Sequence, residues 1–174
     1  MTPPADPYRA LIAQFNRQGV RYVVVGMSGI NYYATDPAET FATLDYDVFL
    51  EPTHLNIERA LRALGRLRVT VGTAEGLLKP DGVTSVVRGR RTLVATNADG
   101  VMVELLLEVS GFTFAELAQD AVTITVRGVP VRVGKLQKLL RSKQLAGRPK
   151  DRQFLKRYEA LLAPTPRKRS TSKR

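Results

Sequence analysis

Residues 20–25 read Val-Arg-Tyr-Val-Val-Val, and this run of β-branched and aromatic side chains constrains the fold more than any other segment. A strand with so little polar alternation is typical of one buried on both faces, which requires helices to cover its sheet. The preceding segment fits that need. An amphipathic helix is predicted to begin at Asp6-Pro7, with the aspartate as its cap, and to end at Gly19.

The same pattern of short apolar strands and amphipathic helices continues along the chain. Further helices are predicted at 30–33, 52–64, 114–119, 135–146 and 149–162, and further strands at 43–50, 67–71, 83–87, 92–96, 101–107, 122–126 and 129–133. The fold class is therefore α/β or α+β, with a mixed β-sheet flanked by helices and two helices that end the body. No repeat or linker divides residues 1–163, which are expected to form one domain.

Composition excludes several classes of function. The chain has no cysteine and a single histidine, His54, which excludes disulfides, thiolate metal sites and sites built from several histidines. No apolar run reaches the roughly 18 residues that a membrane span needs. The N-terminus lacks the pattern of a secretory signal, so we expect a cytoplasmic protein without a membrane partner.

The charge balance favours a polyanionic partner. Lysine and arginine number 27 against 16 acidic residues, a net charge of +11. Residues 164–174 contain five basic residues and no acid, and we expect this segment to be a disordered basic tail. The tail either solubilises the chain or contacts nucleic acid. A second basic block, from Arg132 to Arg157, falls in a helical region.

The strand predicted at 43–50 carries the first candidate site. Side chains alternate along a strand, so Thr43, Asp45 and Asp47 share one face, with the two carboxylates about 7 Å apart at Cα. Such a pair repels itself unless a cation neutralises it, and carboxylate oxygens suit Mg²⁺. The alternative is a solvated strand face.

A small-residue turn, Gly26-Met27-Ser28-Gly29, follows the first strand. Free backbone N–H groups before a helix favour a phosphate, and Ser28 adds a hydroxyl donor. The turn matches neither a P-loop nor a dinucleotide-binding fingerprint. A plain tight turn is the alternative explanation.

A third acid, Glu104, lies among apolar residues in the strand predicted at 101–107. A buried carboxylate without a partner is costly. Glu104 therefore either forms a salt bridge to an arginine or completes a metal site with Asp45 and Asp47. Glu108 lies nearer the strand end, where we expect it to be solvated.

The last two predicted helices each direct a charged residue inward. Lys143 falls within the stripe formed by leucines 136, 139 and 140, and Asp151 falls within the stripe of the second helix. The two side chains either pair with each other, or Lys143 neutralises a triphosphate with the help of Arg148 and Lys150.

Taken in order, these pieces resemble the minimal nucleotidyltransferase fold, and more narrowly the nucleotidyltransferase toxins of bacterial toxin–antitoxin pairs. The pieces are a strand, Gly-x-Ser, Thr-x-Asp-x-Asp on the next strand, a later acid on a third strand, then Lys143 and Gly-Arg-Pro-Lys-Asp. The resemblance spans roughly residues 20–162. It implies Mg²⁺-dependent transfer of a nucleoside monophosphate from an NTP to a hydroxyl, most simply on RNA such as a tRNA 3′ end, and a cognate antitoxin as partner.

The resemblance also implies roles for individual residues. Asp45, Asp47 and Glu104 would bind the metal, and Gly26, Ser28, Thr43, Lys143 and Asp151 would form the nucleotide site, with Lys143 also taking part in catalysis. Three positions depart from the family pattern. Met27 replaces a second glycine, Phe41 stands where an arginine is often found, and Glu104 replaces an aspartate.

Two alternatives stay open at this point. The acceptor could be a protein or a small molecule such as an antibiotic, although a net charge of +11 disfavours cationic antibiotics. The chain could also be a degenerate member that binds RNA or a partner without catalysis, an interpretation that the three departures support.

Overall fold

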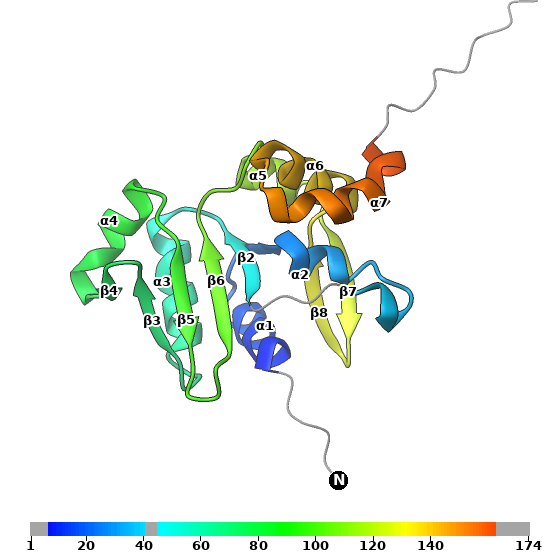
Figure 1. The fold of residues 1–174 in the computed structure, drawn as a ribbon. Helices are drawn as coiled ribbons and strands as arrows, with labels where there is room; N and C mark the ends of the chain where they lie inside the picture. Colours follow the sequence, from blue (N-terminus) through cyan, green and yellow to red (C-terminus); the bar gives the residue numbers. More distant parts are fainter. Residues whose placement is uncertain (1–6, 41–44, 163–174) are drawn as a thin grey trace, which may run out of the picture.

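The computed structural model describes residues 7–40 and 45–162 of the 174-residue chain (Figure 1). Phe41 and Thr43, together with the predicted cap Asp6 and the predicted basic tail, lie outside the described residues. None of the helices in the described ranges is long and apolar enough to cross a bilayer.

Eight strands form one sheet in the order β4-β3-β5-β6-β2-β1-β8-β7. The strands are β1 (Tyr22–Val24), β2 (Tyr46–Leu50), β3 (Thr70–Thr73), β4 (Gly76–Leu77), β5 (Leu93–Thr96), β6 (Met102–Leu106), β7 (Val122–Val126) and β8 (Val129–Val133). The β2–β6 and β1–β8 pairs are parallel and the others are antiparallel. The sheet is therefore mixed, as the sequence predicts.

Helices and short 3₁₀ turns connect the strands. The helices are α1 (Pro7–Arg17), α2 (Gly26–Asn31), α3 (His54–Leu64), α4 (Val83–Arg88), α5 (Phe114–Ala118), α6 (Leu136–Ala146) and α7 (Arg152–Leu162), and the 3₁₀ turns are η1 (Pro37–Glu39), η2 (Pro80–Gly82) and η3 (Pro149–Asp151). Helix α1 packs against α3, whereas α2 packs against β2 and α6, and α6 against α7. Figure 1 shows α6 and α7 gathered beyond one end of the strands, where β6 also ends.

The two long helices α1 and α3 bury the apolar stripes that their sequences predict. In α1 the buried side chains are Leu11, Ile12 and Phe15. Helix α3 begins after Thr53, whose side chain accepts a hydrogen bond from the backbone of Asn56, so the predicted start at Pro52 is two residues too early. These helices cover the central strands, whose valines 23, 24 and 48 are fully buried.

One predicted strand is wrong. Residues 83–87, expected as a strand because of their valines, lie in α4. Val83 and Val86 are buried on one side of this helix, which packs against α3, so helical spacing places both valines in the core. Tertiary packing here overrides the β preference of valine. The predicted strand at 67–71 begins only at Thr70, and the two-residue β4 had no sequence signal.

Candidate active site

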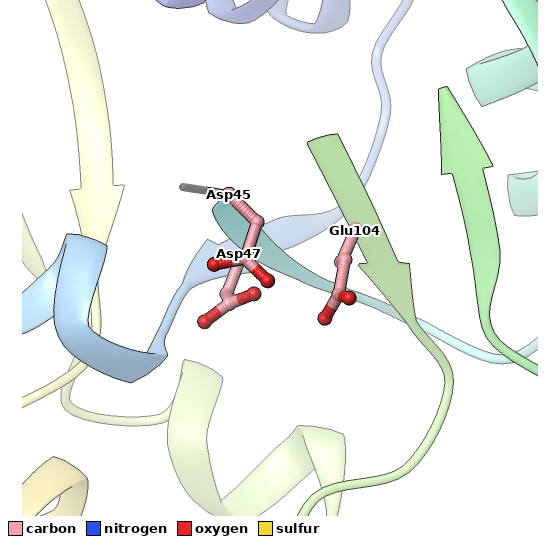
Figure 2. Close-up of side chains that lie close together, drawn as sticks. All are labelled: Asp45, Asp47 and Glu104. Carbon is pink, nitrogen blue, oxygen red and sulfur yellow. The ribbon is translucent and has the colours of Figure 1, made fainter. Parts of the chain in front are cut away.

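Three carboxylates meet near α2: Asp47 from β2, Glu104 from the neighbouring β6, and Asp45, which directly precedes β2 (Figure 2). In the parallel β2–β6 pair Asp47 lies directly opposite Glu104, which places their side chains on the same face. Asp45, two residues before Asp47, shares that face. Each of the three offers one oxygen atom, and these atoms all lie within 4.8 Å of one another. The strand pairing thus brings together the three acids that the sequence singles out.

Gly26 makes room for one of these carboxylates. It begins α2 with a φ of +64°, a conformation that favours glycine. A Cβ atom built at this position would lie 2.1 Å from Asp47 Oδ2, which is far inside contact distance. The residue before it, Val25, also contacts this strand, because its N–H donates a hydrogen bond to the Asp47 carbonyl oxygen at 3.0 Å. The absence of a side chain at Gly26 therefore leaves room for a metal-ligand candidate, and the expected contact of Gly26 with a phosphate stays a prediction.

Ser28 is buried and bonded to the same strand. Its hydroxyl accepts a hydrogen bond from the Asp47 backbone N–H at 3.1 Å and lies 3.3 Å from the Asp45 carbonyl oxygen, to which it donates. Only 5% of Ser28 is exposed. These bonds fasten α2 to the backbone of both aspartates. The expected contact of Ser28 with a phosphate stays a prediction.

The electrostatics of the carboxylate cluster are unfavourable without a cation. Burial raises the pKa of Asp47 from 3.8 to about 7, with the charges of Asp45 and Glu104 as further causes, while Lys143 acts in the opposite direction. Burial also raises the pKa of Glu104, with Asp45 as the next cause. Crowded oxygen ligands of this kind fit a hard divalent cation such as Mg²⁺. The cluster is therefore a candidate divalent metal site.

Lys143 and Asp151 face each other from α6 and η3. Lys143 Nζ lies 3.3 Å from Asp151 Oδ1 and 5.3 Å from the centroid of the Phe154 ring. The side chains are 15% and 5% exposed, respectively. Both residues point inward as the helical spacing predicts, and they form the ion pair that was one of the two alternatives.

One cavity is lined both by residues of the carboxylate cluster and by the Lys143–Asp151 pair. Its volume of about 340 Å³ is within the range of small-molecule sites. Its polar lining residues are Asp47, Arg90, Thr92, Glu104, Glu108, Ser110, Ser142, Lys143, Arg148 and Asp151. Lys143 and Asp151 therefore reach the same cavity as two of the three clustered acids. Glu108 is exposed at its border, in keeping with the prediction that it is solvated.

Asp45 borders a second cavity of about 230 Å³. Tyr8, Tyr32 and Tyr46 line it, and the rings of Tyr8 and Tyr46 stack with centroids 4.5 Å apart. The carboxylate cluster is thus accessible from two cavities. One is lined by charged groups and the other by aromatic rings.

Sequence reasoning missed several residues of the larger cavity. Ser142 follows from helical spacing once α6 is placed, because it lies three residues from Leu139 and four from Ala146, which line the same cavity. Arg90 had no usable signal, because its segment follows residues 83–87, which were expected to be a strand rather than a helix.

The architecture is similar to that of solved structures. An antigenic nucleotidyltransferase-like protein from Paracoccidioides brasiliensis superimposes with a TM-score of 0.53 over 90% of this chain and 75% of its own, at 17% sequence identity. The chain has a nucleotidyltransferase-like fold. This confirms the fold that the sequence resemblance implies, and the likeness extends no further than the fold.

Two Helicobacter pylori structures are more distant. A candidate nucleotidyltransferase and JHP933 reach TM-scores of 0.41 and 0.38 at 12% and 13% identity. Each match covers 78% of this chain, and 54% and 52% of the respective Helicobacter chains. Neither protein-family models nor curated proteins show a match to the sequence.

Gly26→Ala tests the close approach of Asp47. We expect this change to lower the free energy of unfolding by more than about 2 kcal/mol and to weaken Mn²⁺ binding, because the new methyl group displaces the carboxylate. Gly19→Ala is the matched control, since Gly19 has a φ of +66° but no atom within 4 Å of the place that its new methyl group would take. Urea denaturation and Mn²⁺ titration of both variants measure the difference. Equal effects would contradict the steric argument.

The raised pKa of Asp47 predicts a pH-dependent stability. Without divalent ions, the folded protein holds the Asp47 proton up to about pH 7, whereas the unfolded chain releases it near 3.8. The free energy of unfolding should therefore fall between about pH 4 and 7, by up to about 4 kcal/mol from this residue, and level off above pH 7.

Denaturation in EDTA across this pH range measures the effect, with Asp47→Asn as the comparison. The variant should be the more stable protein at pH 8 and show a flatter profile. Identical profiles for the two proteins would show that Asp47 is not the titrating group.

Proposed function

We propose that the chain is a divalent-metal-dependent nucleotidyltransferase that moves a nucleoside monophosphate from an NTP to a hydroxyl group. The observation that carries this proposal is the cluster of three carboxylates, two of which line one cavity together with Lys143. The nucleotidyltransferase-like fold supports it. Mg²⁺ is the cation we expect, because the available ligands are all carboxylate oxygens.

The residues divide into a metal group and a phosphate group. Asp45, Asp47 and Glu104 would hold the divalent ions, which when bound offset phosphate charge and lower the pKa of the attacking hydroxyl. Lys143, with Arg148 on the same cavity, binds the β- and γ-phosphates and neutralises the charge that develops on the leaving pyrophosphate.

The bond changes are those of a single displacement. The acceptor hydroxyl oxygen forms a bond to the α-phosphorus, the bond from that phosphorus to the bridging oxygen of the β-phosphate breaks, and pyrophosphate leaves. Glu104, the acid that comes from the second strand of the cluster, would take the hydroxyl proton. Gly26 and Ser28 keep the aspartates in position, through the space and the hydrogen bonds that they supply.

RNA is the acceptor that we propose, with a tRNA 3′ end as the specific case. The cavity beside Asp45 offers the partly exposed rings of Tyr8 and Tyr32 to a nucleobase, and the net charge of +11 favours a polyanion. A role as a toxin with a cognate antitoxin rests on the sequence resemblance alone.

A transfer assay tests the function. The protein is incubated with each labelled NTP, Mg²⁺ and either total RNA or protein extract, and label on RNA is the expected result. Asp45→Asn and Asp47→Asn should each lower the rate by at least about 10³-fold while the protein stays folded, because each removes a ligand and a repelling charge. Label on protein alone would redirect the proposal to a protein acceptor, and no label on either would contradict it.

Lys143→Met separates the structural role of Lys143 from its role toward nucleotide. The change leaves the buried Asp151 carboxylate without its cation, so we expect a loss of about 3 kcal/mol in the free energy of unfolding. The double variant Lys143→Met/Asp151→Asn removes that charge and should recover most of the loss. NTP affinity should stay low in both variants. Normal affinity in the double variant would make Lys143 purely structural.

A further inference from the structure

Arg90 has a backbone conformation that a side chain seldom adopts. Its φ is +51°, and among the described residues only Arg127, at +47°, is another non-glycine residue with positive φ. The left-handed region brings the Cβ of an L-residue close to its own backbone, which raises the free energy of any residue other than glycine. A residue kept in this region despite the strain points to a role for its side chain.

The local structure does not need an arginine there. Helix α4 ends with Arg91 N–H donating to the Val86 carbonyl oxygen at 3.0 Å and Arg90 N–H donating to the Val87 carbonyl oxygen at 3.3 Å. This pair of hydrogen bonds is the Schellman motif, whose left-handed position is usually glycine. Here the available glycine, Gly89, comes one residue earlier and keeps a negative φ of −86°. The helix would therefore end at least as well with glycine at position 90.

Arg90 lies on the cavity that two of the three candidate metal ligands line. Arg90 lines that cavity together with Asp47, Glu104 and Lys143, and the residue is exposed rather than packed in the core. Arg90 forms no ion pair with any carboxylate in the described part of the chain, whereas its neighbour Arg91 pairs with Glu75. Arg90 thus borders the cavity, and no ion pair within the described residues accounts for its charge.

Its position complements the other cations of the cavity. Lys143 and Arg148 reach the cavity from α6 and the turn after it, whereas Arg90 reaches it from the connection between α4 and β5. Strand β5 begins at Leu93, which lies opposite Leu105, so this connection lies beside the part of β6 that follows Glu104. A group bound between the two sets of cations would carry several negative charges.

We propose that Arg90 binds a phosphate group of a substrate in this cavity, and that its left-handed backbone is retained because it places the guanidinium there. A guanidinium binds phosphate oxygens through two parallel hydrogen bonds, which makes arginine well suited to this task. The inference rests on the proposed function, because it takes the cavity to be the substrate site. The phosphate belongs either to the free nucleotide or to an RNA strand.

Substitution by glycine gives a test in which stability and binding change in opposite directions. Arg90→Gly relieves the backbone and should raise Tm by about 2–4 °C. The same variant should bind a non-hydrolysable NTP analogue, in the presence of Mn²⁺, at least about tenfold more weakly, because it loses a charge-assisted contact. Arg127→Gly is the matched control, since it relieves the same strain in the β7–β8 turn and should raise Tm without changing affinity.

Two further measurements identify the phosphate. Calorimetry with the NTP analogue and filter binding with a single-stranded oligoribonucleotide are carried out on wild type, Arg90→Gly and Arg90→Ala. Weaker binding of the analogue in both variants assigns Arg90 to the nucleotide, and weaker binding of the oligonucleotide assigns it to the RNA strand. Unchanged binding of both ligands in Arg90→Gly would overturn the inference.

The outcome also separates this inference from the proposed function. If wild type binds the analogue and Asp47→Asn does not, the substrate site is supported, and an unchanged Arg90→Gly then defeats only the role of Arg90. If wild type binds neither the analogue nor the oligonucleotide, the proposed function and the inference fail together.

Discussion

The repulsion among Asp45, Asp47 and Glu104 is the constraint on which the rest of the site depends. Charges about 5 Å apart repel by roughly 3 kcal/mol per pair at the effective dielectric of a protein surface region. The parallel pairing of β2 with β6 nevertheless holds Asp47 opposite Glu104, and Ser28 fixes the backbone of both aspartates. Such crowding fits a bound divalent cation, and under the proposed function the surrounding lysine and arginines would bind the anion that accompanies it.

Much of this arrangement could be predicted because it depends on local periodicity. Alternation along residues 43–50 places both aspartates on one face, and an acid in an otherwise apolar strand marks Glu104 as exceptional. Helical spacing directs Lys143 and Asp151 inward, where the structure pairs them. The β7–β8 hairpin also has the predicted bounds, since two alternating runs flank a turn containing glycine.

The parts that escaped prediction depend on contacts between distant segments. Nothing near Gly26 in the sequence indicates that the Asp47 carboxylate occupies the space of its absent side chain. The helical state of residues 83–88 is decided by packing against α3 rather than by the valines themselves. Arg90 combines both difficulties, because its backbone conformation follows from the end of that helix and its position at the cavity follows from the pairing of β5 with β6.

The order of the segments along the chain has a consequence for synthesis. Asp45 and Asp47 precede Glu104 by a long stretch that includes three other strands, and Lys143 and Asp151 come later still. Because the ribosome releases the chain from its N-terminus, the three clustered acids emerge well before Lys143 and Arg148, and contacts over such sequence separations form slowly. The growing chain therefore has no complete site until η3 has left the ribosome and α6 has docked on α2, so the cavity is among the last features that the nascent protein acquires.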